Sequence, residues 1–163
     1  MQARKHFKAL LSDLMGVDPR ALAQQAGLYV TSEQVRGLSR QGFEFGNHTY
    51  SHVFGRSLEA ADFPDEIGRN VTSIKELTGA PVRAFSVPFG SAMDLPPSLA
   101  DYLAATGHET VFLVESLINK TGARRRPIYR VSVSAKTHGE LFSELEFLPR
   151  LRTLGSSLRA KSG

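Results

Sequence analysis

Two histidines lie four residues apart in the stretch GFEFGNHTYSH, residues 42–52, of a chain that has five histidines in all. If the loop that carries His48 and His52 turns helically, both imidazoles face the same way, as a divalent metal requires of a pair of nitrogen ligands. Two nitrogens alone bind a metal weakly, because a catalytic zinc normally has a third protein ligand and an open position for water. The same spacing also fits two unrelated polar loop residues.

A second candidate loop, PFGS, follows the stretch VRAFSV and contains Pro88, Phe89 and Gly90. These residues could shape a site or could simply form a turn that ends a strand. Phe89 could then be either the wall of a cavity or a core residue. Asp94 could lend a carboxylate to a metal, although an ordinary solvated aspartate is the simpler interpretation.

The elements that would position these loops follow from apolar spacing and capping signals. Helices are predicted at residues 4–15, 18–27, 31–42, 67–77, 97–105 and from Thr137 onward. Strands are predicted at residues 43–45, 82–87, 109–115 and 128–133. Strands that alternate with helices predict βα units around a mostly parallel sheet. The two candidate loops then lie at carboxyl ends of strands, where such folds gather their site residues.

The stretch GFEFGNHTYSH resembles the second motif of the polysaccharide deacetylase family, whose members act on chitin oligomers, peptidoglycan and related acetylated sugars. Residues 65–91 resemble the helix and strand of that family that end in a Pro-Tyr-Gly or Pro-Phe-Gly turn. Residues 108–133 are similar to a later strand, loop and strand. The resemblance covers roughly residues 27–150.

The resemblance implies an α/β fold, a distorted (β/α) barrel, and metal-dependent removal of acetyl groups from N-acetylated or O-acetylated sugars. It implies that His48 and His52 ligate a divalent metal, with zinc as the expected ion. The metal would polarise the acetyl carbonyl and activate water, and a carboxylate base would take the proton. The backbone N–H of Phe89 would hold the oxyanion, and Pro88, Phe89 and Gly90 would contact the substrate.

Several family features are missing from this sequence. No Asp-Asp pair occurs, although the family's first motif supplies both the base and the third metal ligand, and the late Leu-x-His motif is absent. Ser86 stands where many members have an arginine that holds the base. We therefore expect an incomplete barrel without its first strands, a truncated deacetylase domain at residues 1–150, a basic tail at 151–163 and an incomplete ligand set. The alternative is a non-catalytic remnant of the fold that binds a sugar or a protein partner.

Composition narrows the possible partners and cofactors. The chain has 163 residues, 41% hydrophobic content and no cysteine, which suits one folded domain and excludes thiolate chemistry. The net charge of +4 comes partly from Arg124, Arg125, Arg126 and the tail, but no aromatic residues are interleaved for base stacking, so nucleic acid binding is not expected. With no export signal or membrane span, the chain is expected to be cytoplasmic. Sheet edges left unpaired by missing strands predict a homo-oligomer.

Overall fold

The computed structural model describes residues 2–119, 127–131 and 137–159. The chain divides into two compact units, Met1–Phe43 and Glu44–Gly163. The division into a domain at 1–150 and a tail at 151–163 stays a prediction, although residues 151–159 belong to a helix. The arginine triplet at 124–126 lies outside the described residues.

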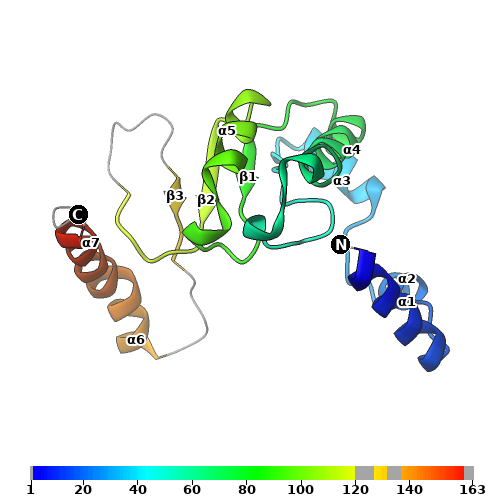
Figure 1. The fold of residues 1–163 in the computed structure, drawn as a ribbon, viewed down its shortest axis with the longest axis horizontal. Coiled ribbons are helices and arrows are strands. Elements are labelled where there is room, and N and C mark those ends of the chain that lie inside the picture. Colours follow the sequence, from blue (N-terminus) through cyan, green and yellow to red (C-terminus); the bar gives the residue numbers. More distant parts are fainter. Residues whose placement is uncertain (1, 120–126, 132–136, 160–163) are drawn as a thin grey trace. The chain divides into compact units, whose positions relative to one another are not determined.

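The first unit consists of three helices in its described part: α1 (Gln2–Met15), α2 (Pro19–Gln25) and α3 (Ser32–Arg40) (Figure 1). Local signals in the sequence explain where two of them begin. The side chain of Asp18 accepts a hydrogen bond from the backbone N–H of Arg20 and caps α2. Thr31 and Gln34 form the predicted capping box at the start of α3. The three helices predicted in this region are therefore confirmed.

The second unit contains a parallel sheet in the order β1 (Ala84–Ser86), β2 (Thr110–Leu113) and β3 (Ile128–Tyr129) (Figure 1). A mixed α/β fold is thus confirmed in the described residues, and the barrel stays a prediction. The strand expected at residues 43–45 is wrong. Only Asn47 joins the sheet, through a parallel bridge to Phe85, and residues 43–45 pair with no strand among the described residues. An alternating pattern makes a strand only where a neighbouring backbone accepts its hydrogen bonds.

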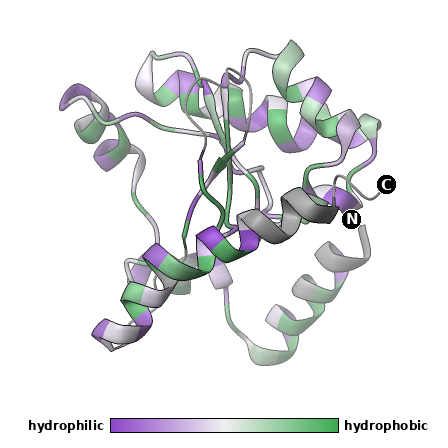
Figure 2. Cartoon of the chain, turned by 90° about the vertical axis from the view of Figure 1, so that its left-hand side faces the viewer, coloured by the Kyte–Doolittle hydropathy of each residue, from purple (hydrophilic) through white to green (hydrophobic). Residues whose placement is uncertain are grey.

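One face of the sheet forms the core of the second unit. Phe85, Val87 and Leu113 point to this face and pack against helix α5 (Pro97–Ala105) and the turn Pro64–Gly68, which leads into α4 (Arg69–Thr78). The complete buried cluster is Leu58, Phe63, Ile67, Phe85, Val87, Leu99, Leu103 and Leu113. Figure 2 shows the strands mostly in the green of hydrophobic residues.

The opposite face of the sheet is the more open one. The register pairs Ser86 with Phe112 and Phe112 with Ile128, so these side chains share a face. None of the three is buried. The turn of Pro88, Phe89 and Gly90 follows the carboxyl end of β1 in this sheet.

The remaining elements are short helical turns before and after β1 and a helical end. The short turns are Gly55–Ser57, Ala60–Asp62 and Ala92–Asp94, and the helical end comprises α6 (His138–Phe142), Ser143–Phe147 and α7 (Leu148–Arg159). The predicted capping box of Thr137 and Glu140 opens α6. Among the described residues, no helix is both long and apolar enough to cross a membrane.

The edge of the sheet at β3 is partly covered by a side chain. The amide of Asn119 donates to the carbonyl of Tyr129 at 2.9 Å and accepts from its N–H at 2.8 Å, as a further strand would. Such pairing removes hydrogen-bonding groups that another chain could use. Oligomerisation through sheet edges stays a prediction.

Candidate functional site

His48 follows the bridge of Asn47 to β1 and has one ring nitrogen already engaged. Its Nδ1 lies 2.7 Å from the backbone carbonyl oxygen of Ser86. A carbonyl can only accept, so Nδ1 carries the proton, and in the neutral imidazole Nε2 keeps its lone pair. Metal-ligating histidines typically have this arrangement, in which the other nitrogen donates to a carbonyl and orients the ring.

His52 brings a second imidazole next to the first. The ring centroids of His48 and His52 are 4.8 Å apart with an interplanar angle of 71°, and both side chains are exposed. The structure therefore brings together the two residues that the sequence suggested as metal ligands. No group of three or more possible metal ligands occurs among residues 2–119, 127–131 and 137–159, so a third protein ligand is not found there.

The turn of Pro88, Phe89 and Gly90 lies against the histidine pair. The ring of Phe89 is 4.8 Å from that of His52 and stacks on Phe54 at 3.8 Å. Phe89 is 53% exposed, so it is a wall residue and not a core residue. Its backbone N–H has no hydrogen-bond partner in the part of the chain that the structure describes. That donor is free to bind a ligand.

Backbone strain is concentrated in these two loops. Among the described residues, the only ones other than glycine with positive φ are Thr49 at 61°, His52 at 54° and Phe89 at 64°. This conformation costs a residue with a side chain about 1–2 kcal/mol. Strain of this kind persists where the surrounding structure enforces it, and it clusters at functional sites.

Buried polar groups hold the histidine loop in this conformation. The side-chain oxygen of Asn47, which is fully buried, accepts hydrogen bonds from Thr49 N and from Asn70, and its amide donates to the carbonyl of Ile67. The buried carboxylate of Glu66 accepts from both the backbone N–H and the hydroxyl of Ser51. Asn47 and Ser51 therefore both have hydrogen-bonding roles in the loop.

Asp94 is not the solvated residue that the sequence suggested. It is 1% exposed, and its Oδ1 lies 3.5 Å from Nε of Arg56. The backbone explains this burial, because Gly55 packs so closely on Asp94 that a Cβ there would meet the Asp94 carbonyl. The ion pair engages Asp94, and in the described part of the chain Asp94 forms no group of three possible metal ligands with the histidines.

Arg130 is a site residue that sequence reasoning missed. It follows β3, and its Nη2 donates to the hydroxyl of Ser86 at 2.9 Å, with its guanidinium over the ring of Phe112. Ser86 thus contacts His48 through its carbonyl and Arg130 through its hydroxyl. The available signal was the position of Arg130 within a predicted strand of a parallel sheet.

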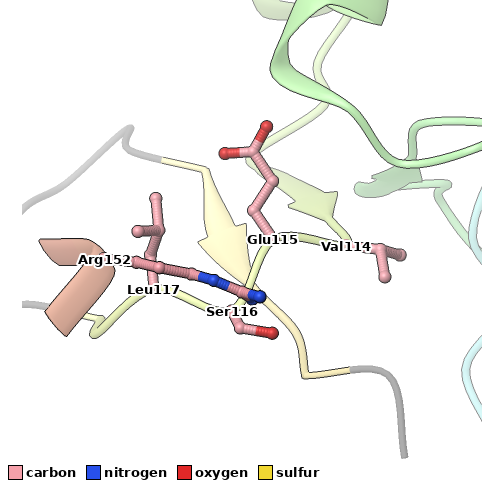
Figure 3. A pocket seen from close by; sticks show the side chains of 5 residues that line it. All are labelled: Val114, Glu115, Ser116, Leu117 and Arg152. Carbon is pink, nitrogen blue, oxygen red and sulfur yellow. The ribbon is translucent and has the colours of Figure 1, made fainter. Parts of the chain in front are cut away.

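A cavity of about 320 Å³ lies near the carboxyl end of β2 (Figure 3). Its lining residues are Val114, Glu115, Ser116, Leu117 and Arg152. It adjoins the Phe89 turn, because the N–H of Val114 donates to the carbonyl of Gly90 at 2.8 Å. None of the residues predicted to form the site lines this cavity.

His108 is a buried residue that contacts the core and does not join the histidine pair. Its Nε2 lies 3.5 Å from the side-chain amide of Asn47, and its ring packs edge-on against Phe85. Burial lowers the pKa of His108 below its ordinary value of 6.5, although a hydrogen bond with the Leu103 backbone opposes the change.

This lowered pKa predicts a pH-dependent stability. The unfolded chain binds a proton at His108 more readily than the folded chain, so the free energy of unfolding should fall as pH drops below about 6.5. The slope from this one group can reach about 1.4 kcal/mol per pH unit. Urea unfolding of the wild type and His108→Gln between pH 7.5 and 5 should show a steeper loss in the wild type. Parallel curves would contradict the assignment.

Comparison with known families agrees with this geometry. The family model described as polysaccharide deacetylase matches residues 17–111, more than half of the chain. The chain therefore belongs to the polysaccharide deacetylase family. The matched region includes both histidines and the Phe89 turn and ends within β2, before Arg130. No curated protein and no solved structure matches the chain.

Proposed function

We propose that the chain carries the site of a metal-dependent carbohydrate deacetylase, a hydrolase that removes acetyl groups from N-acetylated or O-acetylated sugars. The observation that carries the proposal is the pair of adjacent exposed imidazoles, one of them oriented by the Ser86 carbonyl, beside a turn with a free backbone donor. Membership of the family makes an acetylated carbohydrate the expected substrate class.

Two of the residues present can act as ligands of one metal ion. The proton on Nδ1 of His48 leaves its Nε2 as a ligand, and His52 lies near enough to share a cation with it. A divalent metal such as zinc would supply Lewis-acid polarisation of the acetyl carbonyl and activation of water. With two imidazoles and no third ligand among the described residues, the ligand set is incomplete and the affinity should be weak.

The Phe89 turn supplies the other half of the proposed chemistry. Its backbone N–H can donate to the oxyanion that forms when water adds to the acetyl carbonyl. Gly90 gives the turn its shape, because it has a φ of 79° and a Cβ there would lie 2.5 Å from Val114. Pro88 precedes the donor and is buried, which holds the turn in place. Family members with tyrosine in place of Phe89 differ in the side chain, but the backbone N–H donor is the same.

Absence of the Asp-Asp motif from the sequence should slow the reaction. A positioned general base typically contributes about 10²–10⁴-fold to the rate. We therefore expect slow acetate release from acetylated chito-oligosaccharides, dependent on added zinc and lost in His52→Ala. His138→Ala, which changes an exposed histidine of α6, is the control. Release that is equal with and without zinc would contradict the proposal.

The second candidate is a non-catalytic module that binds an acetylated sugar. The observation in its favour is the lack of a third metal ligand in the described part of the chain. Binding of chito-oligosaccharides with no acetate release at any zinc concentration would favour this candidate over the enzyme.

A further inference from the structure

Arg130 reaches across the open face of the sheet toward the histidine pair. Side chains alternate along a strand, so Arg130 lies on the same face as Ile128, and the register places Phe112 and Ser86 on that face too. The Arg130 guanidinium passes over Phe112, with Cζ 5.7 Å from the ring centroid, and Nη2 ends 2.9 Å from the Ser86 hydroxyl.

This contact places a permanent positive charge beside the proposed metal ligands. Ser86 is the shared residue, since its carbonyl lies 2.7 Å from Nδ1 of His48. A guanidinium has five N–H donors, and the contact with Ser86 uses one of them. Arg130 is exposed, so the remaining donors can reach a ligand.

The carboxylates around the site are already engaged elsewhere. Asp94 pairs with Arg56, Glu66 accepts from Ser51, and Glu115 accepts from the N–H of Ala92 at 2.7 Å. Within residues 2–119, 127–131 and 137–159, no carboxylate lies at ion-pair distance from Arg130. An arginine of this kind can bind a carboxylate through two parallel hydrogen bonds.

We propose that Arg130 is the carboxylate-binding residue of this site. The proposal rests on the proposed function for the identity of the ligand, which has two possible sources with the same chemistry. One is the acetate that deacetylation releases. The other is a carboxylate on an acidic acetylated sugar, in which case Arg130 determines specificity.

The test is calorimetric titration of the full chain with sodium acetate, N-acetylmuramic acid and neutral N-acetylglucosamine, each with and without zinc. We expect the wild type to bind at least one of the two carboxylates, and Arg130→Gln to weaken that binding about tenfold or more. Arg130→Lys keeps the charge but not the paired donors, so it should retain part of the affinity.

Arg83→Gln is the matched control. Arg83 precedes β1 at the opposite end of the strand and pairs with Glu109 at 3.5 Å, both groups being exposed. The change removes the same charge from the chain without touching the site. It should leave carboxylate binding unchanged, whereas a loss equal to that in Arg130→Gln would reveal a non-specific effect of net charge and overturn the proposal.

The two sources give different results. Arg130-dependent binding of acetate alone identifies the product, whereas a preference for N-acetylmuramic acid over N-acetylglucosamine that disappears in Arg130→Gln identifies an acidic substrate. Carboxylate binding that is absent, or equal in the wild type and in Arg130→Gln with an unchanged circular dichroism spectrum, overturns the proposal. Failure of zinc to bind would contradict the proposed function instead, and the zinc-free titrations would still test Arg130.

Discussion

His48→Ala should abolish zinc binding by this chain. The wild type is expected to bind one zinc weakly, because two imidazoles and water form the ligand set that the described residues can offer. With His48 replaced, a single imidazole remains, and we expect the affinity to fall at least a hundredfold, below detection by calorimetry. His52→Ala should have the same effect.

His138→Ala is the control for this experiment. His138 is an exposed histidine in the first turn of α6, so its removal lowers the number of imidazoles without touching the pair. Zinc binding should be unchanged in that variant. Tight stoichiometric zinc in the wild type would mean that a further ligand acts with the pair, and zinc retained in His48→Ala would place the metal elsewhere.

Asn47→Ala should be the most destabilising of the substitutions considered. Asn47 is fully buried, and its side chain contacts the Ile67 carbonyl, Thr49 N, Asn70 and His108. Alanine would leave these groups unpaired in the interior, where each unsatisfied polar group costs about 1–3 kcal/mol. We expect the free energy of unfolding to fall by about 3 kcal/mol or more, measured by urea unfolding.

Asn70→Ala provides a graded comparison for Asn47→Ala. It removes one of the two donors to the side-chain oxygen of Asn47 and a 3.3 Å hydrogen bond to the Thr49 carbonyl, and it leaves the other contacts of Asn47 in place. Because Asn70 is only partly buried, its loss should cost about 1 kcal/mol. An equal, small loss in both variants would show that the Asn47 network does not stabilise the loop, and zinc binding should then survive in Asn47→Ala.

Helix ends were predictable from the sequence because their signals are local. Thr31 with Gln34 and Thr137 with Glu140 form the expected capping boxes, and Gly79 ends α4 in the left-handed conformation at a φ of 69°. The partners in a capping box are three residues apart, so no distant part of the chain is needed to form it.

Strand formation and burial were predicted less well because they depend on distant segments. Residues 43–45 alternate as a strand does but pair with no strand in the described chain, whereas Asn47 bridges to Phe85. Asp94 is buried because Gly55, far away in the sequence, packs directly on its backbone. Neither contact can be predicted from the residues next to these positions in the sequence.

The sequence by itself determined the pair of histidines, the Pro88-Phe89-Gly90 turn and the family to which they belong, since these depend on residue types at short spacing. Tertiary structure decided how these parts combine. The Ser86 carbonyl, 38 residues along the chain, orients His48, and Arg130, directly after the third strand, reaches the same serine. Parallel strands bring such residues together only once the sheet has formed, because their connections are long and the pairing is non-local.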